Sequence, residues 1–382
     1  MYQFIARFSA MDFIGTIMDN NDRFDFFETL INTPTPTGSE EAGMLLLGKR
    51  IKEKTGIQPE IDIHGNLHAF LKAGSNKTIM LEGHCDEIGY MVEYIDSNGF
   101  VYFQPLGGII VPLTAAERIT ILSKKGAVNG VIGTRPPHLM SADEKKKVAA
   151  DDLKLLPCDI GATSKEEAES LVSIGDPAIV ATGYRKLAGS RISGRGMDNR
   201  AGAFAMCEAF IEIVNIWGNC FAPPPYNVHF VASVCEEIGL VGGKIASYNV
   251  NPDIGISCDV AFAADAHNGD AKVVGDIKLG KGGALAIGPI YHKGLAEHFK
   301  STAEKSQIPM QLRGVPKGTG NNGWALKMER GGAAVVQIGL PLRYMHTPVE
   351  VVDTKDIEAV IQLVVKSTLS LPSDFDLLPK QP

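Results

Sequence analysis

The spacing of hydrophobic and polar positions changes along the chain and predicts two kinds of region. Residues 22–56 have the spacing of amphipathic helices, interrupted by NTPTPTGSEEAG, where Ser39 is expected to cap the second helix. The apolar segments PEIDIHGNLHAFL and KTIMLEGH follow, and their composition is typical of strands joined by the short turn KAGSN. The first part of the chain should therefore combine helices with strands.

From about residue 88 the pattern becomes β-rich, with Gly or Asn between short apolar segments. This spacing is typical of a small barrel or a sandwich, and helical spacing is confined to about 141–156 and 164–172. After GRGMDNRAG, long helical segments again alternate with buried strands such as YNVHFVASV and DIGISCDVAF. This alternation indicates a layered α/β domain in two sequence pieces with a β-rich domain inserted between them. We place the pieces at 1–87, 88–187 and 188–382, and the chain length of 382 residues suits two domains.

Composition narrows the class of protein. With 45% hydrophobic and 21% charged residues the chain is an ordinary globular protein, and its net charge of −7 argues against nucleic acid or an anionic membrane as the main partner. The six cysteines show no paired spacing, which indicates reduced thiols. The N-terminus lacks the charged and apolar blocks of a signal peptide, and no apolar stretch approaches the ~18 residues of a membrane span. We therefore expect a soluble, cytoplasmic protein.

Acids and histidines recur where apolar strands give way to loops. Strand ends are where ligand sites gather in α/β sheets, because side chains from several strands converge there. Taken alone, each segment has a plain explanation as a surface histidine, a helix cap or a turn. Their number in one chain points instead to a site. The segments are TIMLEGHCDEIG (His84, Asp86), GRGMDNRAG (Asp198), VASVCEEIG (Glu236, Glu237), IGISCDVAF (Asp259) and PLRYMHTPVEV (His346).

These side chains have the chemistry of a site for two metal ions. Oxygen and imidazole ligands suit divalent ions without any thiolate. A carboxylate can bridge two ions ~3.5–4 Å apart, and Asp198 is expected to do so. His84 and Asp259 would complete one ion's ligands, and Glu237 and His346 the other's, with a water between the ions.

Two acids remain outside the ligand sets, Asp86 and Glu236. Asp86 lies two residues after His84, so a strand places both on one face, where the carboxylate can hold the second imidazole nitrogen. Glu236 is free to act as the general base on the water between the ions. The adjacent acids Glu236 and Glu237 would then have separate tasks.

In this order, the segments GHCDEIG, GRGMDNRAG, CEEIGLVGG, CDVAFAAD and LRYMHTPVEV resemble the motifs of the M42 family of dinuclear metallo-aminopeptidases. The resemblance runs from about residue 22 through essentially the whole chain, and includes RPPHL at 135–139. It implies the same five metal ligands, Glu236 as general base and Asp86 behind His84. It also implies a three-layer α/β catalytic domain with a central mixed sheet, an inserted PDZ-like barrel domain for dimerisation, and dimers assembled into a hollow tetrahedral dodecamer.

The resemblance further implies peptide substrates and two divalent ions per subunit, with zinc preferred and cobalt or manganese as alternatives. One segment departs from the family: KGTGNNGWA (317–325) stands where members commonly read Gly-Thr-Asp-Ala, so the preferred N-terminal residue is not predicted. The first 20 or so residues form an extension, either disordered or an oligomer contact.

Two alternative functions remain open from the residues. A glycoside hydrolase also needs paired carboxylates, but it does not need two histidines and a bridging aspartate. A non-catalytic metal-binding scaffold could keep the same fold, although this chain retains all five ligands and the base. A metal-dependent aminopeptidase is the leading hypothesis.

Overall fold

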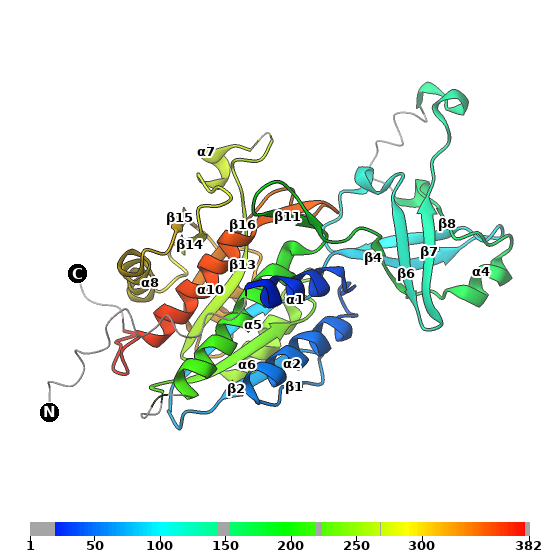
Figure 1. Cartoon of the computed structure of the whole chain (residues 1–382). Helices are drawn as coiled ribbons and strands as arrows, with labels where there is room; N and C mark the ends of the chain where they lie inside the picture. The colour runs from blue at the N-terminus through cyan, green and yellow to red at the C-terminus, as the bar shows by residue number, and fades with distance from the viewer. Residues whose placement is uncertain (1–19, 144–152, 219, 221–223, 268, 379–382) are drawn as a thin grey trace, which may run out of the picture.

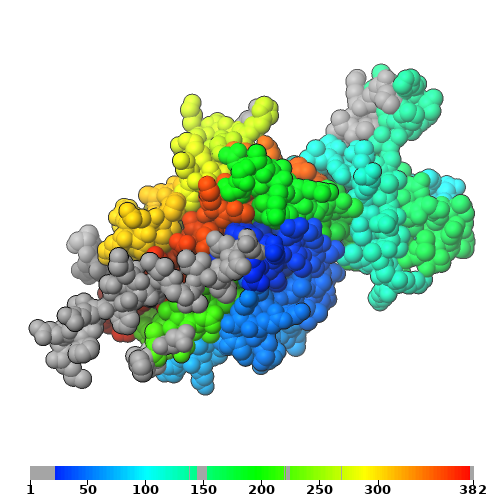
Figure 2. Space-filling model, viewed as in Figure 1, coloured from blue at the N-terminus to red at the C-terminus, as the bar shows by residue number. Residues whose placement is uncertain are grey.

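The computed structural model describes residues 20–143, 153–218, 220, 224–267 and 269–378. An α/β body carries a β-barrel that projects from one end, where β4, β6 and β7 are seen at the right of Figure 1. The space-filling view shows the barrel and its loops as a lobe beside the body (Figure 2). The N-terminal extension up to residue 19, and the centre of the helix expected at 141–156, lie outside the described residues.

A mixed sheet of eight strands forms the middle layer of the body. The four central strands β12, β3, β13 and β16 are parallel to one another, and the strands on either side of them, β2 and β14, run antiparallel to their neighbours β12 and β16. β2 and β3 are consecutive in sequence, as expected around KAGSN, but β12 lies between them in the sheet. In sheet order the strands are β1 (Glu60–Ile61), β2 (Leu67–Leu71), β12 (Asn227–Ser233), β3 (Thr78–His84), β13 (Ile254–Phe262), β16 (Ala334–Leu342), β14 (Gly283–Ile287) and β15 (Met310–Gly314).

Helices cover both faces of this sheet, because alternate residues of the central strands are apolar on each side. On β3, Ile79 and Leu81 join the large core and Met80 joins a smaller one. The helices of the large core are α1 (Asn20–Asn32), α2 (Glu41–Thr55), α5 (Met197–Gly218), α8 (Lys293–Ser306) and α10 (Thr354–Leu369). Those of the smaller core are α6 (Val241–Val250) and α9 (Asn322–Met328), and α7 (Ala271–Val274) lies in a projecting loop (Figure 1). The expected three-layer fold is confirmed.

The central helix of the large core is α5. Within the described residues it is the one helix that is long and apolar enough to cross a membrane, but 78% of the relevant window is buried inside the protein. Asp198 and Asn199 at its start have non-helical backbone angles, so Asp198 stands at the junction of loop and helix. One local expectation is wrong: the residue preceding α2 is Glu40 rather than Ser39, and it makes no side-chain cap. The Glu40 carboxylate instead accepts hydrogen bonds from the N–H groups of Gly38 and Cys235.

The β-rich region is a closed antiparallel barrel with its own core, which includes Tyr90, Phe103 and Ile121. Ser164 caps α4 (Lys165–Leu171), which matches the helix expected at 164–172. In barrel order the strands are β4 (Gly89–Ile95), β5 (Val101–Leu106), β8 (Cys158–Asp159), β7 (Gly126–Ile132), β6 (Arg118–Ser123) and β9 (Pro177–Val180). A third small sheet consists of β10 (Arg185–Lys186), β11 (Arg191–Gly194) and β17 (Glu350–Asp353). All six cysteines are free thiols.

Candidate metal centre

The parallel strands bring the predicted ligands to one edge of the central sheet. His84 is the last residue of β3 and is aligned with Ser233, the last residue of β12, so Glu236 and Glu237 follow in the loop beside it. Asp259 lies on the neighbouring strand β13, which continues for three residues beyond it rather than ending there as expected. Asp198 reaches the same edge from the start of α5, and His346 from the loop after β16.

Asp198 lies between the two histidines. Its Oδ1 is 3.4 Å from Nε2 of His84, and its Oδ2 is 3.5 Å from Nε2 of His346. On the His346 side, Oε2 of Glu237 is 3.6 Å from Nε2. On the other side, Oδ1 of Asp259 is 3.9 Å from Nε2 of His84. Each carboxylate oxygen of Asp198 therefore faces a different group of side chains.

Two groups of three side chains have ligand atoms that all lie within 4.8 Å of one another. They are His84, Asp198 and Glu237, and His84, Glu236 and Asp259. Both include His84, and the second includes Glu236, whose Oε2 is 3.8 Å from Nε2 of His84. The two groups contain four of the five expected ligands, but His346 is in neither of them, and Glu236, the expected base, stands in the second. They therefore differ from the two ligand sets expected from the sequence.

Asp86 is completely buried behind this cluster. Its Oδ1 accepts a hydrogen bond from the N–H of Glu236, and its Oδ2 accepts from the N–H of Glu237 and the hydroxyl of Thr37. Oδ1 also lies 3.3 Å from Nδ1 of His84, which makes no hydrogen bond within the described residues. Asp86 thus holds the loop that carries both glutamates beside His84. Thr37 was not anticipated from the sequence.

Burial raises the pKa of three carboxyls in the cluster, because the charged form loses solvation. The pKa is raised to about 9 for Glu236, about 8 for Glu237 and about 7 for Asp259. The charge of Asp198 raises all three further. At neutral pH the protein alone does not stabilise the full negative charge of this cluster, so its carboxylates suit divalent cations.

The two histidines have a raised pKa, and they lower the pKa of Asp198, which lies between them. Burial raises the pKa of Asp198, but hydrogen bonds from His346 and His84 lower it to about 2. The bond to Asp198 raises the pKa of His346 to about 9. Burial lowers the pKa of His84, but Glu236 and Asp198 raise it well above the usual range. Without cations, protonated histidines compensate the carboxylates; with cations, the neutral imidazoles could serve as ligands.

Two further groups hold the ligand segments, and neither was predicted. Glu350 at the start of β17 accepts hydrogen bonds from the N–H of His346 at 2.9 Å and of Asp198 at 3.2 Å. The carbonyl oxygen of Gly108, in the barrel loop after β5, lies 3.0 Å from Nδ1 of His346. Glu350 could have been identified from the sequence, because this acid lies only four residues after His346 in HTPVE. Gly108 could not, because it lies 238 residues before His346 in the chain.

The segment that departs from the family pattern reaches the centre through Asn322. Its Nδ2 donates hydrogen bonds to Glu82 at 2.7 Å and to the hydroxyl of Ser233 at 2.9 Å. Glu82 is completely buried on β3 two residues before His84, and it also accepts from Ser233 and Ser257. Asn322 therefore supports the strand ends that carry the expected ligands.

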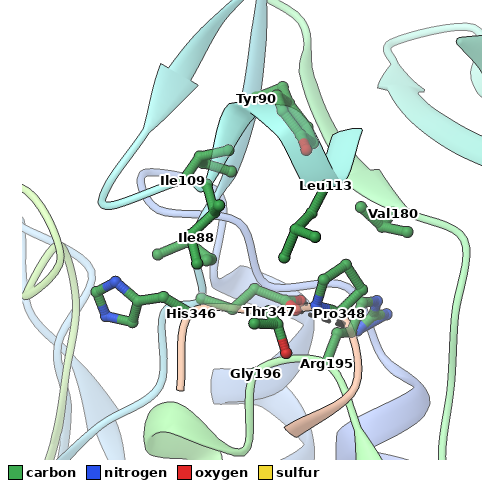
Figure 3. Close-up of a pocket in the computed structure, with 12 residues that line it drawn as sticks. Ile88, Tyr90, Ile109, Leu113, Val180, Arg195, Gly196, His346, Thr347 and Pro348 are labelled. Atoms are coloured by element: carbon green, nitrogen blue, oxygen red, sulfur yellow. Dashed lines mark hydrogen bonds and ion pairs between the residues drawn. The ribbon is translucent and has the colours of Figure 1, made fainter. Parts of the chain in front are cut away.

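A small cavity of about 30 Å³ lies between the barrel and the body. Figure 3 shows Ile88, Ile109, Leu113 and Val180 around it, while the ring of His346 points away from it. Its walls are mostly apolar, although Glu87 and Arg195 also line it.

The comparisons with known proteins identify the family. A family model described as M42 glutamyl aminopeptidase matches residues 65–363. The chain belongs to the M42 family of aminopeptidases. As an M42 protein it is a hydrolase that acts as an exopeptidase, and the family is metal-dependent. The resemblance drawn from the five motifs is confirmed, and aminopeptidase activity is favoured over the scaffold and glycosidase alternatives.

Relatives of this M42 aminopeptidase match it over nearly their whole length. The lysyl aminopeptidase of Pyrococcus furiosus is 33% identical over 356 residues, which cover 92% of this chain and 99% of the relative. A TET aminopeptidase from Thaumarchaeota archaeon SCGC AB-539-E09 has a TM-score of 0.85 at 29% identity, covering 93% of this chain and 98% of its own. The TET1 peptidase of Pyrococcus horikoshii, which can assemble into a tetrahedron or a large octahedral shell, has a TM-score of 0.77 at 29% identity, covering 91% and 100%.

Proposed function

We propose that this M42 aminopeptidase releases N-terminal residues from peptides by means of two divalent metal ions, with zinc preferred over cobalt or manganese. His84, Asp198 and Asp259 would hold one ion. Asp198, Glu237 and His346 would hold the other. The observation that carries the proposal is the position of Asp198, whose two oxygens face two different histidines at 3.4 and 3.5 Å. Separations of this size suit ligand atoms that share an ion at about 2.0–2.2 Å each.

Glu236 is proposed as the general base. When bound, the ions would polarise the scissile carbonyl and lower the pKa of the attacking water. Oε1 of Glu236 is buried and makes no hydrogen bond within the described residues, so it is free to accept a proton. The same oxygen can return that proton to the departing amine. Asp86 would keep Glu236 in place through its backbone N–H.

We also propose that the chain forms a homo-oligomer, by analogy with the TET1 peptidase of Pyrococcus horikoshii, which can assemble into a tetrahedron. The barrel, with limits near residues 88 and 187, would mediate dimerisation within a dodecamer. A hollow assembly would admit peptides and exclude folded proteins.

Adjacent variants provide a matched test of the two glutamates. Glu236→Gln should bind metal as the wild type does but lower kcat by about 10²–10⁴-fold, because it removes the base. Glu237→Gln should instead weaken the binding of one ion. Metal content is measured by mass spectrometry after equilibrium dialysis, and kcat with a panel of aminoacyl-p-nitroanilides. A Glu236→Gln enzyme with wild-type turnover would remove Glu236 from the role of base.

A further inference from the structure

The barrel contributes directly to the metal centre through the loop that follows β5. The carbonyl oxygen of Gly108 in this loop lies 3.0 Å from Nδ1 of His346, a residue 238 positions later in the chain. A carbonyl oxygen can only accept a hydrogen bond, so Nδ1 must carry the proton. The lone pair of the neutral ring is then on Nε2, the nitrogen that faces Asp198 and Glu237 at 3.5 and 3.6 Å.

The fit between loop and centre depends on two glycines. A Cβ atom on Gly108 would lie 2.6 Å from Nδ1 and 2.9 Å from Cε1 of His346. A Cβ on Gly107 would lie 2.7 Å from Cγ2 of Ile88 and 3.2 Å from Cβ of Glu237, and Gly107 has a φ of +80°. The loop thus passes close to both side chains that would share the second ion with Asp198, and it leaves no room for a side chain of its own.

His346 needs such a support more than the other expected ligands do. Its side chain is 34% exposed, whereas those of His84, Asp198, Glu237 and Asp259 are at most 9% exposed. Glu350 holds the backbone N–H of His346 but not its ring. The Gly108 carbonyl is therefore the contact that fixes which way the ring is turned and which nitrogen is free.

We propose that Gly108 is a positioning residue, whose carbonyl fixes the tautomer and orientation of the His346 ring for metal binding. The inference rests on the proposed function in one respect, the assignment of His346 to an ion. It adds that the metal centre is incomplete without the barrel. Loss of this hydrogen bond should weaken the ion held by His346 about 10–100-fold, the usual cost of removing a partner of a ligating histidine.

Gly108→Ala tests the inference in the full-length protein. The loop borders an open hollow of about 350 Å³, so either the loop or the ring can give way to the new methyl group, and both movements break the hydrogen bond. Gly133→Ala is the matched control, because a Cβ there meets nothing within 4 Å. His346→Ala is the reference for loss of the ligand. Each variant is titrated with Zn²⁺ alone, and bound ions per subunit are counted at equilibrium.

We expect wild-type protein to bind about two Zn²⁺ ions per subunit. Gly108→Ala and His346→Ala should each bind one of these ions more weakly, while Gly133→Ala binds both as the wild type does. If His346→Ala loses an ion but Gly108→Ala binds as the wild type does, the inference is wrong and the proposed ligand set stands. If His346→Ala itself keeps both ions, the ligand assignment in the proposed function fails, and the inference fails with it.

A second measurement observes the imidazole protons of the wild-type protein directly. Long-range ¹⁵N–¹H correlation spectra of the Zn²⁺-loaded wild type report which imidazole nitrogens carry protons, and His346→Ala identifies the relevant signal. We expect a protonated Nδ1 and an unprotonated Nε2 for His346. The reverse tautomer would overturn the inference.

Discussion

Glu236 and Glu237 are neighbours in sequence, yet they lie in different surroundings. The backbone N–H groups of both residues donate hydrogen bonds to Asp86, so one buried carboxylate fixes the backbone from which the two side chains extend. Glu237 reaches toward His346, at 3.6 Å, whereas Glu236 reaches toward His84, at 3.8 Å. Both lie in the loop beyond β12 rather than on opposite faces of a strand. Cys235, which precedes them in this loop, has a positive φ. The different directions of the two side chains are what separate tasks require.

The titration of these residues predicts how metal removal changes stability with pH. Glu236, Glu237 and Asp259 have a raised pKa in the folded protein, to about 9, 8 and 7, so the folded state holds more protons than the unfolded state above about pH 4.5. The raised pKa of His346, to about 9, acts in the same direction above pH 6.5. The stability of the metal-free protein should therefore fall as pH rises from 6 to 9.

Melting temperatures measured by circular dichroism, with chelator and with Zn²⁺, check this expectation. The chelated protein should lose more than about 5 °C between pH 6 and 9, and the loaded protein less, because bound ions replace the protons. Equal pH dependence in the two forms would contradict the account. Asp198, with its pKa lowered to about 2, contributes no change in this window.

At the scale of elements, two buried carboxylates join segments that are far apart in sequence. Asp86 joins the end of β3 to the loop after β12, and Glu350 joins the start of α5 to the loop after β16. Asp86 accepts hydrogen bonds from the backbone N–H groups of Glu236 and Glu237, and Glu350 accepts them from those of Asp198 and His346. The pair therefore helps to fix the distances between the proposed ligands through their backbone, independently of their side chains.

Glu350→Gln tests this role. A glutamine amide has one acceptor oxygen, and its NH₂ group would face one of the two N–H groups that Glu350 now satisfies. Metal affinity should fall about 10–100-fold, measured by titration with Zn²⁺. Glu297→Gln, on the exposed surface of α8, is the control and should bind metal as the wild type does. Unchanged affinity in Glu350→Gln would show that β17 does not support the centre.

The elements that carry the ligands could be predicted from sequence, because each buried apolar run ends near an acid or a histidine. The helix expected at 201–217 and the strands at 226–234 and 253–262 correspond to α5, β12 and β13. Their order in the sheet could not be predicted, since the insertion of β12 between β2 and β3 depends on long-range pairing. The Gly108 contact escaped prediction for the same reason, and the four-residue strand β17 was too short to show a pattern.

At the scale of the whole molecule, a buried ion network joins the first described helix, α1, to the last, α10. Arg23 on α1 is 2% exposed and pairs with Glu208 on α5, Glu358 on α10 and Glu212. Arg50 on α2 also pairs with Glu208, at 2.8 Å. The helices α1, α2 and α10 are therefore joined to the core helix α5, which starts at the proposed metal centre.

Glu208→Gln should destabilise the protein by about 3 kcal/mol, because two buried arginines lose a charged partner. The exposed pair Lys49–Glu53 provides the comparison, and Glu53→Gln should cost less than about 0.5 kcal/mol. Chemical denaturation of metal-loaded protein measures both. Similar losses in the two variants would mean that the buried network adds little to stability.

The place of β3 in the sheet has a consequence for synthesis of the chain on the ribosome. Both of its neighbours, β12 and β13, come from residues 227–262, so β3 has no partner until they have emerged. The barrel, formed by residues 89–180, is complete earlier and can fold first. The last expected ligand, His346, emerges after the other four. A nascent chain therefore exposes an unpaired apolar strand until β12 and β13 have emerged, and it can acquire the full proposed set of metal ligands only after His346 has been made.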